Sequence, residues 1–305
     1  ISRGVEALGA TLGASARWDS SVNDLSVMSS NVPKAMEYVA DVARNAAFAK
    51  EEFERERDQT IDGLQVDLTQ PRVLAGAVTS RLIFGEGPYG HTLNGTPATI
   101  KNIKREDLVR FHRNDYVPQN SVLVLAGDIE GDAAFQLAES AFGTWKRGTT
   151  ETAAAAQAAQ SAAPRVVVID MPDAGQASVI VGRRGIRRTD PGYTQALVAN
   201  SILGGGYSSR LNQEIRIKRG LSYGAGSSFN ARVDVGPFTA STDTKNESAA
   251  EVGEILVDEI GRLAAADVPD TELTPRKAAL IGDFAQSLET TSGIVDAISA
   301  LALYG

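Results

Sequence analysis

An alanine- and glutamine-rich stretch in the middle of the chain limits what its 305 residues can fold into. The stretch "TTETAAAAQAAQSAAPR", residues 149–165, contains no large apolar side chain. Such a segment cannot bury a face against a core, so it is typical of a linker. A chain of this length also lies where one hydrophobic core usually divides into two. We therefore expect a first domain at residues 1–149, a linker at 150–164 and a second domain at 165–305.

The two parts show similar patterns on either side of this linker. Residues 51–64 align with residues 271–284, and each stretch follows a strand–helix unit. The alignment brings apolar side chains together in three pairs: Phe53 with Leu273, Ile61 with Ile281, and Leu64 with Phe284. We interpret the chain as two copies of one α+β domain. The predicted fold is a pair of homologous α/β-roll domains, each a mainly antiparallel sheet with helices on one side, and both incomplete at the chain ends.

Hydrophobic periodicity assigns the elements within each domain. Helices are predicted at 32–48, 50–68, 71–84, 105–116, 191–203, 208–219, 248–263 and 271–288, with another ending near Phe142. Strands are predicted at 25–32, 121–128, 165–170, 177–185, 222–233 and 236–244.

Composition excludes several classes of function. The hydrophobic fraction is 43% and the charged fraction 22%, as in ordinary soluble globular proteins. A net charge of −8 repels phosphate backbones and anionic lipid, so nucleic acid is not an expected partner. No apolar run is long enough to cross a bilayer, which argues against membrane insertion. The absence of cysteine excludes disulfides and thiolate metal sites without indicating a compartment.

Residues with metal or nucleophile chemistry are sparse. His91 and His112 are the two histidines, and neither belongs to a helix with the H-E-x-x-H or H-x-x-E-H spacing that grips zinc. No serine has an assigned general base, so no nucleophilic serine is predicted. The segment "GGGYSSR", residues 204–210, opens a helix like a phosphate loop, but it lacks the lysine of that motif and is more simply a chain reversal. We predict no metal site in this chain.

The stretch "EIRIKRGLSYGAGSS", residues 214–228, raises a different possibility. If the helix ends near Arg219 with Gly220 as its left-handed cap, Arg216 lies one turn back and Tyr223 lies just beyond the end. The two side chains can then converge. The alternative is structural, with the basic residues complementing the helix dipole and Tyr223 half-buried. The residues alone favour this structural alternative.

A family resemblance changes that balance. The block "ILGGGYSSRLNQEIRIKRGLSYGAGSSF" resembles the C-terminal-domain signature of the pitrilysin-type (inverzincin) zinc peptidases, which include insulin-degrading enzyme and the mitochondrial processing peptidase. Blocks of the first half are similar to that family's first domain, in the same order: "EALGATLGASARWD", "EEFERERD", "FGEGPYGHTLNGT", "YVPQNSVLVLAGD" and "FGTWKRG". The resemblance covers nearly the whole chain.

The resemblance also implies a zinc site, and this sequence departs from the family's pattern of zinc ligands. Family members carry an H-x-x-E-H helix upstream and a further glutamate ligand in an E-R-x-x-x-x-x-E motif. Glu56 and Arg57 match the start of that motif, but the ligand position falls on Gly63, which has no side chain to bind zinc. The family's arginine and tyrosine, spaced as Arg216 and Tyr223 are, hydrogen-bond substrate opposite the zinc.

The expected function follows from this resemblance. The chain is predicted to be the non-zinc subunit of a heterodimeric zinc metallopeptidase, inactive alone, with zinc held by a homologous partner. Arg216 and Tyr223 are the expected catalytic and substrate-binding residues, and an unfolded peptide is expected to add as a strand along Ala225, Gly226 and Ser227. Two alternatives stay open: a self-sufficient homodimeric zinc peptidase, and a scaffold subunit without activity. Bacterial members of this two-chain type lead us to expect a periplasmic location, with the cytoplasm as the alternative.

Overall fold

The computed structural model describes residues 1–148 and 165–305. The expected linker at 150–164 lies outside these residues, so the domain boundary there stays a prediction. The helices are α1 (Ser2–Glu6), α2 (Val32–Arg44), α3 (Lys50–Asp67), α4 (Pro71–Phe84), α5 (Pro97–Asn102), α6 (Arg105–Asp115), α7 (Gly131–Phe142), α8 (Tyr193–Leu203), α9 (Arg210–Asn212), α10 (Ala249–Ala265), α11 (Asp270–Ser287) and α12 (Thr291–Tyr304). A π-helical segment, η3 (Gln213–Lys218), continues α9, and single 3₁₀ turns lie at Ser29–Asn31, Pro118–Asn120 and Asn246–Ser248.

The strands form two antiparallel sheets, as predicted for an α+β fold. The first is a hairpin of β1 (Thr11–Ala16) and β2 (Ser21–Ser26), with Thr11 opposite Ser26. The second contains β3 (Ala177–Arg184), β4 (Ala225–Phe229) and β5 (Pro237–Thr244) in the order β3-β5-β4. The described part of the chain contains no helix that is long and apolar enough to cross a membrane.

The described residues fall into two compact units. The first combines the described parts of residues 1–61, 98–155 and 286–305, and the second combines those of residues 62–97 and 156–285. The predicted repeat is visible in the helices: α3 and α11 each have 18 residues, and α4 and α12, which follow them, each have 14. Each of these following helices belongs to the unit formed mainly by the other half of the chain: α4 is part of the second unit, and α12 is part of the first.

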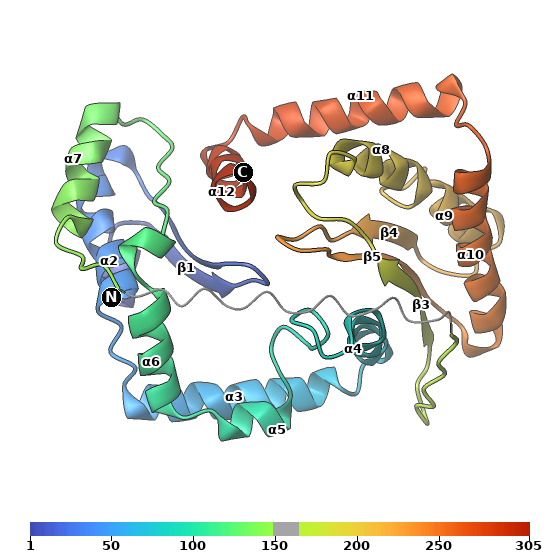
Figure 1. The fold of residues 1–305 in the computed structure, drawn as a ribbon, viewed down its shortest axis with the longest axis horizontal. Helices are drawn as coiled ribbons and strands as arrows, with labels where there is room; N and C mark the ends of the chain where they lie inside the picture. The colour runs from blue at the N-terminus through green and yellow to red at the C-terminus, as the bar shows by residue number, and fades with distance from the viewer. Residues whose placement is uncertain (149–164) are drawn as a thin grey trace. The chain divides into compact units, whose positions relative to one another are not determined.

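The second unit has helices on both faces of its sheet. Leu211, Ile215, Ala240, Val252 and Leu256 are fully buried in one hydrophobic cluster, which joins α9, η3 and α10 to the sheet. Because side chains alternate along a strand, Gly182 faces away from this cluster, where a Cβ would lie 2.6 Å from Thr79 of α4. Figure 1 shows α8 and α10 beside the sheet formed by β3, β4 and β5.

Two predicted strands have no counterpart in the structure. Residues 121–128 and 165–170 are not assigned to any strand, and Val122, Val166 and Val168 are exposed. The pattern of branched apolar residues there is typical of a strand, but a strand also needs a hydrogen-bonded neighbour. Within the described residues no strand pairs with either segment.

Candidate functional site

The helix that carries Arg216 is anchored by its apolar face. Leu211 and Ile215 lie four positions apart and are fully buried in the cluster against β5 and α10. Arg216, the next residue, therefore lies at the exposed surface of the second unit. It belongs to the π-helical segment η3. Such wider turns are rare in proteins, and where they occur they often lie at functional sites.

The end of this helix has the predicted geometry. Gly220 has a φ of +64°, a left-handed conformation that glycine adopts without steric cost. Its N–H donates to the Arg216 carbonyl at 3.1 Å, and the Leu221 N–H donates to the Ile215 carbonyl at 2.9 Å. The expected left-handed cap at Gly220 is confirmed.

Tyr223 lies in a tight turn between this helix and β4. The Gly224 N–H donates to Ser222 Oγ at 3.1 Å, and the buried Thr242 hydroxyl lies 2.7 Å from the Gly224 carbonyl oxygen. The turn is thus held by backbone and hydroxyl contacts, while the Tyr223 side chain is 90% exposed. The half-buried tyrosine of the structural alternative is therefore wrong.

Arg216 contacts a tyrosine that the sequence analysis did not consider. Its guanidinium carbon lies 5.0 Å from the ring centroid of Tyr207, a cation–π distance. Tyr207 belongs to the "GGGYSSR" loop, which the sequence predicts only as a chain reversal. The sequence offered one signal for Tyr207: it is an aromatic residue just before the helix that carries the candidate Arg216.

The neighbouring charges are paired among themselves. Glu214 forms ion pairs with Lys218 and with Arg219, the latter at 2.6 Å. The hydrogen bond from Lys218, followed by that from Arg219, lowers the pKa of the Glu214 carboxyl despite partial burial. None of the ion pairs found in residues 1–148 and 165–305 involves Arg216. Its charge is therefore not neutralised by a carboxylate of the described chain.

Strand β4 lies at the edge of its sheet, but that edge is partly occupied. The Ala225 N–H donates to Asn212 Oδ1 at 3.4 Å, and the Ser227 N–H donates to the Gly204 carbonyl at 3.2 Å. Both groups point away from the partner strand β5, because they donate elsewhere. A peptide that added along Ala225, Gly226 and Ser227 would have to displace these acceptors.

The zinc position implied by the resemblance does not fit the side chains present. Glu56 and Gly63 are exposed on α3, and a Cβ at Gly63 would meet no atom within 4 Å. Among the described residues, no three His, Cys, Asp or Glu side chains group closely enough to hold a metal ion. His91 Nδ1 lies 2.8 Å from the Thr92 carbonyl oxygen, and His112 contacts the Ala43 carbonyl oxygen and stacks on Tyr116.

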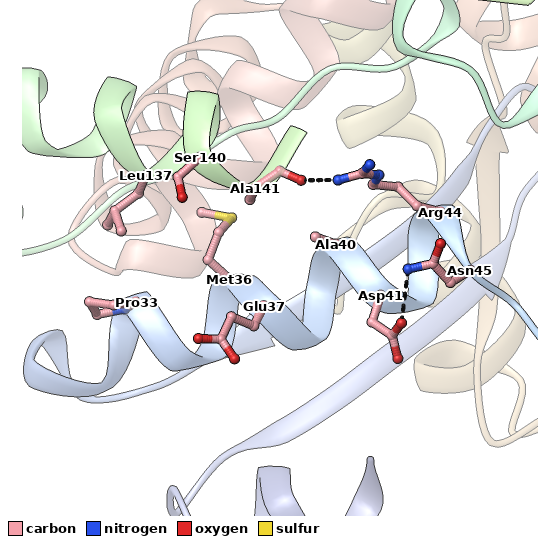
Figure 2. A pocket seen from close by; sticks show the side chains of 10 residues that line it. All are labelled: Pro33, Met36, Glu37, Ala40, Asp41, Arg44, Asn45, Leu137, Ser140 and Ala141. Carbon is pink, nitrogen blue, oxygen red and sulfur yellow. Dashed lines mark hydrogen bonds between the residues drawn. The ribbon is translucent and has the colours of Figure 1, made fainter. Parts of the chain in front are cut away.

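A separate cleft lies in the first unit, between α2 and α7 (Figure 2). It has a volume of about 380 Å³, and its apolar lining comes from Pro33, Met36 and Leu137. Two of the polar groups at its rim are already partnered: Arg44 donates to the Ala141 carbonyl, and Asp41 accepts from Asn45 at 3.0 Å. It contains none of the predicted site residues.

Comparisons with known proteins agree with this fold. Residues 102–280 match the family described as the peptidase M16 inactive domain, and residues 1–95 match the insulinase family, peptidase family M16. The chain belongs to the M16 peptidase family, which confirms the resemblance to pitrilysin-type enzymes.

Several of the similar proteins come from bacteria. The chain is 27% identical over 98% of its length to an uncharacterized zinc protease of Streptomyces coelicolor, covering 66% of that protein, and 28% identical over 96% to one of Mycobacterium tuberculosis, covering 67%. It therefore spans about two thirds of the length of these relatives. A peptidase M16 inactive domain from Pseudomonas fluorescens matches with a TM-score of 0.92 at 28% identity, covering 99% of this chain and 73% of that one.

A protease from Helicobacter pylori matches at 20% identity with a TM-score of 0.89, over 98% of this chain and 73% of that one. This likeness concerns the fold alone. Taken together, the matches support a peptidase-like chain built on the M16 fold.

Proposed function

We propose that this chain is the non-zinc subunit of a two-chain M16 metallopeptidase. In this assignment a homologous subunit holds the zinc ion and the hydrolytic water, and this chain contributes binding groups for an unfolded peptide. The match of more than half of the chain to the inactive-domain family supports the assignment. The glycine at the expected ligand position also supports it, because a zinc site needs at least three protein ligands.

The observation that carries the proposal is the exposed and unpaired guanidinium of Arg216 among the described residues. Its guanidinium is exposed, lies against an aromatic ring and takes part in no ion pair found in the described residues. Its N–H donors can therefore reach a peptide carbonyl oxygen. The exposed hydroxyl of Tyr223 adds a second donor seven residues further on. Donors aimed at a carbonyl oxygen stabilise the negative charge that develops there during hydrolysis.

Replacement of these two residues tests the proposal. With a zinc-bearing homologue present, Arg216→Ala should lower turnover of an unstructured fluorogenic peptide about tenfold to a thousandfold, the range for losing one such donor. Tyr223→Phe removes only the hydroxyl and should have a smaller effect. Assembly of the two chains should not change in either variant.

Arg219→Ala is the matched control. Arg219 lies at the same helix end and pairs with Glu214, so it shares the charge of Arg216 but not the proposed role. Turnover should be unaffected. Full activity of both Arg216→Ala and Tyr223→Phe, or an equal loss in Arg219→Ala, would show that these residues serve the helix end only.

Two other functions remain distinguishable by measurement. A homodimeric zinc peptidase would bind one zinc per full-length chain and cleave peptides without a partner. A scaffold subunit would co-purify with no zinc-bearing homologue. For location we propose the periplasm, which fractionation of the source cells would test.

A further inference from the structure

We infer that Tyr207 is a positioning residue for Arg216, holding its guanidinium by the ring face in the orientation that peptide binding requires. This inference rests on the proposed function of Arg216. Its basis is the 5.0 Å separation between the Arg216 guanidinium carbon and the Tyr207 ring centroid. Both side chains are at the surface, and Tyr207 is 64% exposed, so its ring is not explained as part of a core.

A contact with an aromatic ring differs from an ion pair in which N–H donors of the arginine guanidinium it leaves available. A carboxylate would use the N–H groups at the edge of the guanidinium plane, whereas an aromatic face attracts the cation through the π system. The planar fork of N–H donors therefore stays free for a carbonyl oxygen. Glu214, the nearest acid along the helix, does not compete, because Lys218 and Arg219 occupy it.

The backbone that carries Tyr207 is itself tied to the site. Asn212 is 4% exposed, and its Nδ2 donates to the Tyr207 carbonyl at 2.6 Å. The Oδ1 of the same side chain accepts from the Ala225 N–H. The buried Asn212 amide thus connects the loop of Tyr207 to Ala225, the first residue of β4. Asn212 itself lies one helical turn before Arg216.

This arrangement explains why a long side chain at the surface can act with defined geometry. A free arginine side chain has many rotamers, and it loses this conformational entropy on binding. Contact with a ring on a fixed loop restricts the side chain before the peptide arrives. The benefit should appear in turnover, because it concerns the placement of the donor at the reacting carbonyl.

The experiment uses the full chain with its zinc-bearing homologue and replaces Tyr207 by Leu and by Phe. An exposed cation–π contact is worth about 0.5–1 kcal/mol, so Tyr207→Leu should lower kcat about two- to fivefold with little change in KM. Tyr207→Phe keeps the ring face and should keep the activity. In an Arg216→Ala background, Tyr207→Leu should have no further effect. Tyr193→Leu, which removes a ring 4.1 Å from Arg188, is the matched control and should leave kcat unchanged.

Nuclear magnetic resonance gives a readout that does not depend on activity. The Arg216 side-chain protons should show an upfield ring-current shift that disappears in Tyr207→Leu and persists in Tyr207→Phe. A loss of activity that is the same with and without Arg216 would overturn the inference, since Tyr207 would then act independently. Absence of the ring-current shift would also overturn it. Full activity of Arg216→Ala would instead overturn the proposed function, and the inference with it.

Discussion

Arg216 differs from the other basic residues of its helix end in what it contacts. Lys218 and Arg219 share the carboxylate of Glu214, and they suit the negative end of the helix dipole. Arg216 lies against the Tyr207 ring and keeps its hydrogen-bond donors. Three cations within four residues therefore have two different environments, which the charge pattern alone does not distinguish.

Gly63 allows a test of the missing zinc ligand at a single residue. Gly63→Glu should bind no zinc, because one added carboxylate cannot replace the three protein ligands that a site needs. No atom lies within 4 Å of the new Cβ, and glycine is a poor helix residue, so the free energy of unfolding should stay the same or rise by up to about 1 kcal/mol. Metal analysis and chemical denaturation measure the two quantities. One zinc per chain in this variant would contradict the assignment.

At the scale of elements, α9 is connected to α11 by an ion pair that makes stability depend on pH. Arg210 forms two hydrogen bonds with Glu272, at 3.0 and 2.6 Å, and these lower the pKa of the Glu272 carboxyl. A lowered pKa means stability that is present above the ordinary value near 4.5 and is lost as the pH falls through the folded-state pKa.

Glu272→Gln should therefore lower the free energy of unfolding by about 1 kcal/mol at pH 7. The difference from the unmodified chain should shrink as the pH falls below about 4.5. Denaturant unfolding measured between pH 7 and pH 3 checks this. Glu254→Gln, at an exposed position on α10, should show no such pH-dependent difference. A difference that stayed constant with pH would mean that the charge of Glu272 is not involved.

At the scale of the whole molecule, each compact unit contains a helix from the other half of the chain: α4 belongs to the second unit and α12 to the first. Gly182 on β3 has a Cβ position 2.6 Å from Thr79 and 3.0 Å from Ile83, both on α4. Gly182→Ala should lower the free energy of unfolding by about 1–3 kcal/mol, because the added methyl overpacks this contact. Gly76→Ala, on α4 with no atom within 4 Å of the new Cβ, is the control and should be neutral or stabilising. Equal stability of the two variants would show that α4 does not cover β3.

The proposed two-chain assembly predicts the metal content and the activity of the isolated chain. The purified full-length chain should bind no stoichiometric zinc and cleave no peptide, since the described residues offer no ligand cluster and the expected ligand position is Gly63. Addition of a zinc-bearing homologue should restore cleavage. Elemental analysis beside a peptide-cleavage assay measures both. Activity of the isolated chain with one bound zinc would establish the homodimeric alternative instead.

Local signals along the chain determined much of this structure. Apolar spacing together with Pro71 places α4 at the observed residues, and Gly220 ends the helix of Arg216 as its sequence position indicates. The similarity of 51–64 to 271–284 likewise corresponds to two helices of equal length. These features depend on residues that are neighbours in the chain, so the sequence by itself was sufficient for them.

The tertiary structure decided which distant surfaces meet. Homologous halves present similar apolar faces, so the periodicity of α4 does not say which sheet it covers. The strand pattern of residues 165–170 likewise does not provide a neighbouring strand, and none pairs with it among the described residues. Arg216 meets Tyr207 because the loop path, tied by Asn212, brings a ring nine residues earlier onto the same surface. Spacing along a helix cannot predict such a contact, because it depends on how the chain folds back before the helix begins.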